Sequence, residues 1–356
     1  MLTEETKVNI TAERLHKLIK DKLVLAGLPE EQAEETSNHL VYADMIGVHS
    51  HGAVRVEYYS ERISKGGINT NPQLEFEQTG PSTAIYHGDN GQGHFVVNKS
   101  LEDVIRLAKE SGVAVVGISR VGHTGTLSYY LRKIAKQDLI GIAVTQSDPM
   151  VVPYGGAEVY YGTNPIAFSA PTAGNDPIVF DMATTVQAWG KILDARSKGN
   201  EIPDTWAVDA SGTPTTDPHN VAGLVPIAGP KGYGLMMMVD ILAGVLLGLP
   251  FGSSVSSMYH DLSEKRNLGQ TFIVIDPSRF RDIEAFKNDI TQTIDELHNI
   301  PTAPGFDQVY YPGELSLIAM EKSQNEGIDI PKSIIDYLES NEIFINSSDH
   351  KGIFAD

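Results

Sequence analysis

The sequence contains no cysteine among its 356 residues. This absence excludes disulfide bonds, thiolate catalysis and zinc or iron–sulfur sites built on cysteine. Basic residues are also scarce, because 27 Lys and Arg stand against 46 Asp and Glu, for a formal net charge of -19. A nucleic-acid-binding protein needs a basic face to meet the phosphates, so this balance argues against a nucleic-acid partner. A small anionic substrate would need a local positive pocket in a negative surface.

Long hydrophobic runs are absent as well. The longest run, residues 235–250, is short for a membrane span and carries Asp240 near its middle, which favours a buried core helix and no membrane partner. The N-terminal stretch is polar and acidic, unlike a secretory signal. We therefore expect a soluble, cytoplasmic protein. Apolar residues make up 41% of the chain, enough for a sizeable core, and the length suggests two domains.

The pattern of apolar residues predicts helical ends around a mixed α/β middle. Helices are expected over residues 11–27 and 29–46, from Ser50 onward, over 283–300 and in the C-terminal tail. Short β-branched runs typical of buried strands cover residues 112–118, 139–146, 164–171, 177–184 and 269–277, and a helix capped by Ser100 is expected over 100–112. The fold class is thus α/β (α+β). We expect a helical domain of residues 1–75 plus 315–356 and an α/β domain of residues 76–314.

The stretch GVHSHGAVRVEYYSERI carries the first candidate site. If a helix begins at Ser50, the serine hydroxyl caps it, and His51, Arg55 and Tyr59 lie along one face at i, i+4 and i+8. Such a face offers a guanidinium fork for a carboxylate and two further hydrogen-bonding groups. From the spacing alone, a solvated polar stripe is the simpler interpretation. A metal site on the two histidines is disfavoured, since no acidic third ligand lies at helical spacing.

The second candidate site follows two expected strands. His123 lies in a glycine-bracketed turn after the strand of residues 112–118, where an exposed imidazole can act as a general base near neutral pH. A surface turn histidine is the alternative. Ser147 and Asp148 follow the strand of residues 139–146, and Asp148 either orients a histidine and stabilises its charge or forms an ordinary Asp-Pro turn.

Two junctions carry candidate groups for a phosphate-containing ligand. Asp181 lies where a strand leads into a helix, and Lys231 lies in a glycine-rich lead into the hydrophobic helix. Backbone N–H groups and a lysine at a helix N-terminus favour phosphate. The chain has no Walker pattern, and the glycines of residues 88–97 do not complete a dinucleotide fingerprint, because Val96 stands where the third glycine would fall.

Taken in order, these segments resemble the malate/L-lactate dehydrogenase family, which is separate from the Rossmann-type lactate dehydrogenases. The resemblance rests on HSHGAVRVEYYSERI, ISRVGHTG, DPMVVPYGGAEVYYGTNPIAF, FDMATT, DTWAVDASGTPTTDP, GPKGYGL and PGE, and it covers nearly the whole chain. The clearest departure is Val48, where many members carry an acidic residue.

The resemblance implies a 2-hydroxy acid dehydrogenase that uses NAD and binds it in a non-Rossmann domain, here residues 76–314. It also implies a homodimer, or a multiple of dimers, whose active site lies where subunits and domains meet. By position, it implies that His123 is the catalytic acid/base and that Ser50, His51, Arg55 and Tyr59 bind substrate. From its place after a strand, and not from the resemblance, Asp148 is expected to orient His123. The implied cofactor contacts are Ser147, Asp181, Met182, Ala183, Lys231, Gly313 and Glu314. No metal is expected. A binding protein without activity and a metal-dependent hydrolase are the alternatives from other classes.

Overall fold

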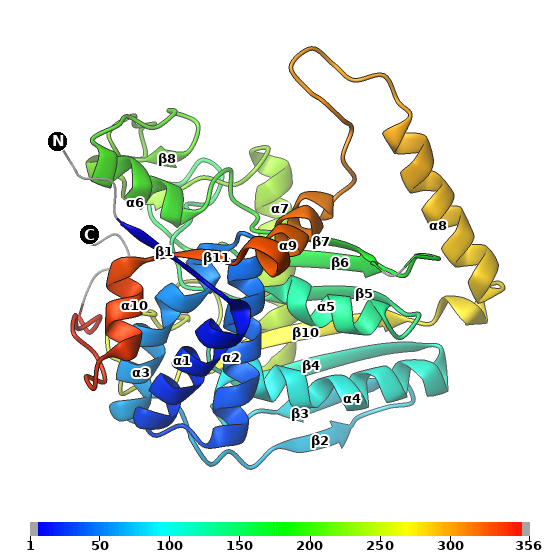
Figure 1. Ribbon diagram of the computed structural model, residues 1–356, viewed down its shortest axis with the longest axis horizontal. Coiled ribbons are helices and arrows are strands. Elements are labelled where there is room, and N and C mark those ends of the chain that lie inside the picture. The colour runs from blue at the N-terminus through cyan, green and yellow to red at the C-terminus, as the bar shows by residue number, and fades with distance from the viewer. Residues whose placement is uncertain (1–5, 175, 351–356) are drawn as a thin grey trace.

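A seven-stranded mixed sheet forms the centre of the computed structural model, which describes residues 6–174 and 176–350 (Figure 1). The strand order is β2-β3-β4-β10-β5-β6-β7. The strands are β2 (Glu75–Gln78), β3 (Thr83–His87), β4 (Val113–Val121), β5 (Ile140–Thr145), β6 (Ile166–Ala170), β7 (Ile178–Met182) and β10 (Leu268–Ile275). The β3–β4 pair is parallel and the other pairs are antiparallel. The prediction of a mixed, non-Rossmann sheet is therefore confirmed.

The middle strand of the sheet, β10, comes from late in the chain. Its Phe272 lies opposite Val116 of β4 and Ala143 of β5, and all three are fully buried. That face is covered by α4 (Gly93–Ser111) and α5 (Leu127–Ala135). On the other face, the Thr271 hydroxyl donates to Leu242 O of α7 (Pro230–Ala243) at 2.7 Å. Because helices cover both faces, side chains on both faces of the strand are buried, and buried and exposed positions do not alternate along it.

A helical assembly lies at one end of the sheet and joins the two ends of the chain. It comprises α1 (Ala12–Leu25), α2 (Glu30–Met45), α3 (Val56–Ser64) and α10 (Lys332–Glu339), with a ribbon in which β1 (Lys7–Ile10) pairs with β11 (Ile328–Pro331). The buried Leu15, Ile19 and Leu40 share a core with Ile330 of β11. The helices expected near the N-terminus and in the tail are thus present.

Two further parts complete the fold. A small separate core lies around α6 (Trp189–Lys198) and the short pair β8 (Ala207–Val208) and β9 (Gly223–Leu224). Helix α8 (Ile283–His298) projects from the body, and a long connection returns from it to α9 (Glu314–Glu326), as Figure 1 shows.

Two expected helix starts are wrong. The helix expected from Ser50 begins at Val56, after two short 3-10 turns. Ser100 is not a cap, because α4 already begins at Gly93; its hydroxyl donates to Val97 O one turn back, at 2.7 Å. The spacing of apolar residues did not show that the glycine-rich segment before residue 94 leads directly into α4.

The hydrophobic helix is only partly a core helix. Residues Pro230–Leu247 are long and apolar enough to cross a membrane by composition, with mean hydropathy 1.3, but core helices of soluble proteins pass the same test. Val239 packs against Val144 of β5 and Met236 belongs to the small core around α6, and both are fully buried, whereas Met238 is 38% and Ile241 47% exposed. The expected core helix is therefore only partly buried, since α7 leaves one apolar face uncovered in the single chain.

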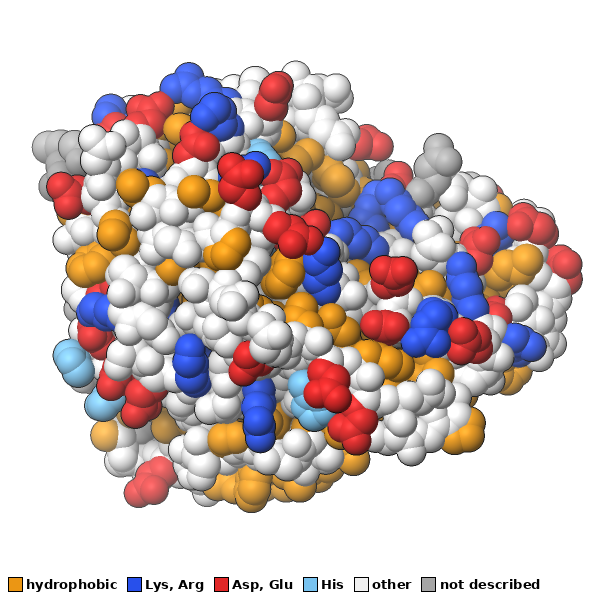
Figure 2. Space-filling model, turned by 90° about the horizontal axis from the view of Figure 1, so that it is seen from below, with side chains coloured by type: hydrophobic (Ala, Val, Ile, Leu, Met, Phe, Trp, Pro, Cys, Tyr) orange, Lys and Arg blue, Asp and Glu red, His pale blue; other side chains and the backbone are white. Residues whose placement is uncertain are grey.

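The negative net charge is not spread evenly over the surface. Figure 2 shows a face on which Lys and Arg side chains alternate with Asp and Glu, with hydrophobic side chains between them. Basic side chains on this face therefore lie among acidic ones, although the net charge of the chain is negative.

Candidate active site

Two tight turns carry the residues predicted to bind substrate. They are η1 (His49–His51) and η2 (Ala53–Arg55), directly before α3. Ser50 Oγ lies 3.0 Å from His51 Nδ1, and Arg55 Nε donates to Ser50 O at 2.7 Å. Tyr59 follows in α3 and is 1% exposed. The side chains therefore meet through a turn that folds back on itself, and not along one helix face.

His123 lies in the loop after β4 and meets this group. Its Nδ1 is 2.7 Å from the Tyr59 hydroxyl, and its ring centre is 5.5 Å from that of His51. Arg55 Nη1 donates to the Tyr259 hydroxyl at 2.8 Å. An imidazole, a guanidinium and two phenols from separate segments thus gather in one place.

The His123 loop is fixed from behind by α2 and α4. The fully buried His39 accepts the Thr126 backbone N–H at Nε2, at 2.9 Å. The Tyr130 hydroxyl donates to Thr124 O at 2.6 Å. A Cβ on Gly93 would lie 2.3 Å from His123 O, so only glycine fits where α4 starts. The glycine-rich segment that fails as a dinucleotide fingerprint therefore supports this loop.

The predicted contact between Asp148 and His123 is wrong. Asp148 pairs with the Arg266 guanidinium and accepts the backbone N–H of Met258. The Asp148 side chain is 5% exposed and the Arg266 side chain 2%. Both charges are therefore buried, and each would lack a counter-charge without the other. The group that faces His123 Nδ1 is the Tyr59 hydroxyl.

Burial controls the electrostatics of the site. It lowers the pKa of His123 well below the usual 6.5, and the neighbouring His51 and Arg55 lower it further. Burial likewise lowers the pKa of His51 to about 3 and raises the pKa of Tyr59. At neutral pH the site thus offers neutral imidazoles, a protonated phenol and one fixed positive charge.

Ser147 belongs to a chain of hydrogen bonds that runs to the start of α7. The Thr163 N–H donates to Ser147 Oγ at 2.7 Å, and the Thr184 hydroxyl donates to Thr163 O at 2.9 Å. The Ile227 N–H then donates to Thr184 O at 2.9 Å. Lys231 lies just beyond, exposed in the first turn of α7.

Asp181, Met182 and Ala183 lie at the end of β7 and meet the helix that follows the His123 loop. Asp181 Oδ2 accepts the Ser128 backbone N–H at 2.9 Å, in the first turn of α5. Surrounding protein raises the pKa of the Asp181 carboxyl to about 6, although the residue remains partly open to solvent. Met182 and Ala183 are half-buried.

Gly313 and Glu314 lie at the start of α9, beside β7. Gly313 has a φ of 93°, and a Cβ there would lie 2.0 Å from Val179 O, so the position requires glycine. The Glu314 carboxylate lies 2.9 Å from His298 Nε2 and accepts the Tyr311 N–H at 3.0 Å. Its side chain is thus already engaged by the connection from α8.

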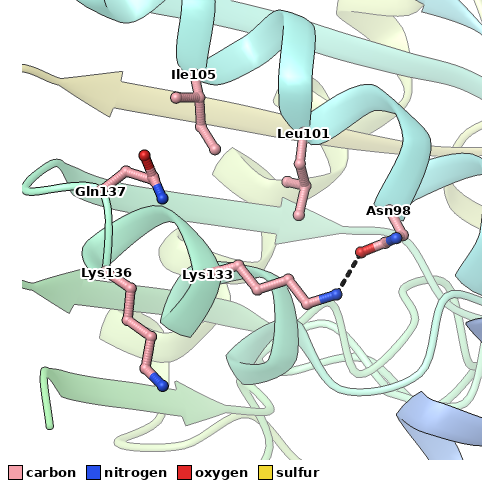
Figure 3. A pocket seen from close by; sticks show the side chains of 6 residues that line it. All are labelled: Asn98, Leu101, Ile105, Lys133, Lys136 and Gln137. Carbon is pink, nitrogen blue, oxygen red and sulfur yellow. Dashed lines mark hydrogen bonds between the residues drawn. The ribbon is translucent and has the colours of Figure 1, made fainter. Parts of the chain in front are cut away.

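A surface recess of about 360 Å³ lies apart from these residues, between α4 and α5 (Figure 3). It is lined by Asn98, Leu101, Ile105, Lys133, Lys136 and Gln137. Lys133 Nζ points to Asn98 and donates to its Oδ1 at 2.6 Å. Because none of the predicted site residues lines this recess, we do not assign the site to it.

No cluster of three or more His, Asp or Glu side chains in residues 6–174 and 176–350 is arranged to hold a metal ion. The two histidines of the HSH triplet have different partners. His49 Nδ1 lies 2.8 Å from Asp44, whereas His51 Nδ1 lies against Ser50.

Comparisons with known proteins show the family of the chain. Residues 10–339 match the malate/L-lactate dehydrogenase family. The chain is 57% identical over 348 residues to ureidoglycolate dehydrogenase (NAD(+)) of Escherichia coli K12, covering 98% of this chain and 100% of that one. The malate dehydrogenase structure from Pyrococcus horikoshii OT3 superposes with a TM-score of 0.85 at 35% identity, covering 96% of this chain and 95% of that one. The sulfolactate dehydrogenase of Methanocaldococcus jannaschii gives 0.87 at 36% identity, covering 94% and 96%.

The chain belongs to the malate/L-lactate dehydrogenase family. The described site also includes residues that were not predicted from the sequence. Tyr259 and Arg266 lie in an irregular loop before β10, where no periodic pattern distinguishes one polar residue from another. His94 lies at the start of α4, with its ring centre 5.3 Å from Tyr59 and 6.3 Å from His123. Only its place beside the glycine-rich lead could have drawn attention to it.

The residues on the β7 side suit a nicotinamide dinucleotide by their chemistry. Gly229, with a φ of 59°, leads into the first turn of α7, where the exposed ammonium of Lys231 adds to the positive end of a 14-residue helix. This combination suits a pyrophosphate. The Ser147 hydroxyl and the Asp181 carboxylate supply hydrogen-bonding groups suited to ribose and amide.

Proposed function

We propose that the protein oxidises (S)-ureidoglycolate to oxalurate with NAD. The observation that carries the proposal is the meeting of His123, a neutral base, with Arg55, a fixed cation, at one site. The substrate follows from the E. coli relative, whose name states that activity. The runs YADMIGVHSHGAVRVEYYSERISKGG, QSDPMVVPYGGAEVYYGTNP and FDMATTVQAWGKILDARS resemble that enzyme in particular.

His123 takes the hydroxyl proton of the substrate. An alcohol that lost hydride and kept this proton would become a protonated carbonyl, so a base must remove it as the hydride leaves. A general base contributes roughly 10²–10⁴-fold to the rate. The lowered pKa of His123 keeps the imidazole unprotonated at neutral pH and ready to accept.

Tyr59 determines which ring nitrogen of His123 accepts the substrate proton. Its raised pKa keeps the phenol un-ionised, and its oxygen lies 2.7 Å from His123 Nδ1. When Nδ1–H donates to that oxygen, the lone pair is on Nε2, which is then free to take the substrate proton. Tyr59 thereby acts as an orienting group, the role first expected of Asp148.

Arg55 binds the carboxylate of the hydroxy acid, with Ser50 and His51 beside it. A guanidinium holds a carboxylate through two parallel hydrogen bonds, which fixes the orientation of the carbinol carbon. NAD, when bound, supplies the hydride acceptor. The residues proposed to hold it are Ser147, Asp181, Met182, Ala183, Lys231, Gly313 and Glu314. Because the Glu314 carboxylate is occupied by His298, we assign the contact at this position to the backbone.

The protein is proposed to work as a homodimer, or a multiple of dimers, in the cytoplasm, in the breakdown of allantoin. The uncovered apolar face of α7 supports self-association, because Met237, Met238 and Ile241 are all at least 36% exposed and continue into Leu246, which is 58% exposed. A soluble chain seldom leaves such a face open to water. We also propose that the chain has two domains, one formed by residues 1–75 plus 315–356 and the other by residues 76–314.

The same chemistry on malate, lactate or sulfolactate is the alternative, and relatives named for malate and sulfolactate support it. A panel of these acids and (S)-ureidoglycolate, each assayed with NAD and with NADP at fixed concentration, tests both. We expect the highest kcat/KM for (S)-ureidoglycolate with NAD. Preference for another acid would replace the substrate, and no turnover on any of them would refute the proposal.

A further inference from the structure

Asp44 is a buried carboxylate at the unfavourable end of a helix. It lies in the last turn of α2 and is 2% exposed. The C-terminal end of a helix carries partial negative charge, which disfavours an anion, and burial removes the water that would solvate it. A carboxylate in this position needs strong donors.

Both donors come from the turns that carry the proposed substrate residues. Oδ1 lies 2.8 Å from His49 Nδ1, and Oδ2 accepts the Ala53 N–H at 2.7 Å. Ser50 and His51 lie between these two points, and Arg55 ends the turn that Ala53 begins. One carboxylate thus holds both ends of the segment.

Gly52 allows this close approach. A Cβ at that position would lie 2.2 Å from Asp44 Cγ and from Oδ1, which is well inside contact distance. The glycine of the HSHG sequence is therefore required by the carboxylate beneath it, and the two positions form one unit.

Close packing is incomplete beside Asp44 and the segment that it holds. A recess of about 210 Å³ lies there, between the segment and the β11–α10 junction. Its lining includes Asp44, His49, Ser50, Val54 and Ile334, and Val54 is 49% exposed. Because packing is incomplete here, the two hydrogen bonds of Asp44 contribute to fixing the position of the segment.

We propose that Asp44 is a positioning residue for substrate binding, which acts through His49 and Ala53 without touching the substrate. The inference rests on the proposed function, because it takes Ser50 and Arg55 as substrate ligands. Arg55 Nε donates to Ser50 O, so movement of the segment carries the guanidinium with it.

The test compares Asp44→Asn and His49→Ala with the wild type. An asparagine keeps one acceptor oxygen, so one of the two donors loses its partner. We expect KM for the hydroxy acid to rise by about 10-fold in Asp44→Asn, with a smaller change in kcat, and by about 3-fold in His49→Ala. The double variant should resemble Asp44→Asn alone, because both changes remove the same bond. NADH affinity, followed by fluorescence, should stay at the wild-type value.

Asp21→Asn is the matched control, because this carboxylate lies on the surface of α1 and its loss changes the net charge equally. Unchanged KM in both test variants would overturn the inference. So would an Asp44→Asn protein that loses NADH binding and cooperative unfolding while His49→Ala keeps the wild-type KM, since Asp44 would then be purely structural. The assay uses whichever acid the wild type oxidises best. A wild type inactive on the whole panel would refute the proposed function and this inference with it, whereas an active wild type with unaffected variants refutes the inference alone.

Discussion

The Tyr59 hydroxyl lies 2.7 Å from His123 Nδ1, where an Asp–His pair would have a carboxylate. A phenol orients the imidazole as a carboxylate does, but it brings no negative charge to stabilise the imidazolium. Burial, together with the neighbouring His51 and Arg55, lowers the pKa of His123 well below 6.5. The proposed base is therefore weak, neutral at physiological pH and quick to give up the proton it accepts.

Replacing His123 with alanine should lower kcat for hydroxy-acid oxidation by roughly 10²–10⁴-fold, because the proposed general base is lost. NADH should still bind, since the proposed cofactor residues lie on other segments. Steady-state NADH formation and fluorescence titration measure the two effects. Near-normal turnover would remove His123 from its proposed role.

Tyr59→Phe should lower kcat by about 10-fold, the loss expected for one hydrogen bond worth about 1.4 kcal/mol. The matched change is Tyr259→Phe, which removes a phenol oxygen bonded to Arg55. Tyr259→Phe should mainly raise KM, because it loosens the guanidinium and leaves the imidazole in place. Identical kinetic effects of the two changes would argue against separate roles.

Arg55→Lys should raise KM for the hydroxy acid by about 10- to 100-fold, because an ammonium cannot replace the two-pronged contact with a carboxylate. The effect on kcat should be smaller. Arg14→Lys is the control, since the Arg14 side chain is 65% exposed. A KM within twofold of wild type would show that Arg55 does not bind the carboxylate.

The acid limb of kcat/KM for oxidation should lie below pH 6.5. Oxidation needs neutral His123, and a lowered pKa means that the neutral form persists below the ordinary value, so activity falls only when the pH approaches the lowered pKa. A profile of kcat/KM from about pH 5 to pH 8 measures this limb. A limb at or above pH 6.5 would contradict the buried, positively flanked setting of the ring.

Asp148→Asn should lower the free energy of unfolding by about 3–5 kcal/mol, because it leaves the buried Arg266 without its counter-charge. Urea unfolding followed by circular dichroism measures the change. Replacing the pair together, with Asp148→Leu and Arg266→Met, should recover most of the loss. If the single change were as stable as the wild type, the buried ion pair would not be a strong restraint on the loop that carries Tyr259.

Much of the fold could be predicted because its elements carry strong local patterns. The β-branched runs of β4, β5 and β10 and the apolar spacing of α1 mark strands and a helix clearly. The order of the strands could not be predicted, because the sequence of a strand that is buried on both faces does not show which strands lie beside it. For a similar reason, α7 was expected to be a buried core helix. The composition of a helix shows that one face is apolar, but it does not show what covers that face.

The candidate site likewise contains residues that could be predicted from the sequence and residues that could not. His123, Arg55 and Tyr59 lie in segments with informative spacing, and the structure brings them together. Tyr259 lies in an irregular loop and contacts Arg55 across the fold, which no local pattern encodes. The partner of Asp148 was mistaken because the sequence does not say which opposite charge a buried carboxylate will meet.

The position of β10 also bears on how the protein acquires its activity. The loops carrying His123 and Ser147 follow β4 and β5, and these two strands are joined in the sheet only through β10, residues Leu268–Ile275. Contacts between distant parts of a chain form late, because the intervening loop must close first. A nascent chain on the ribosome therefore cannot bring the two halves of the site together until β10 has emerged. Until then, the apolar edges of β4 and β5 are exposed and are the surfaces most in need of protection from aggregation.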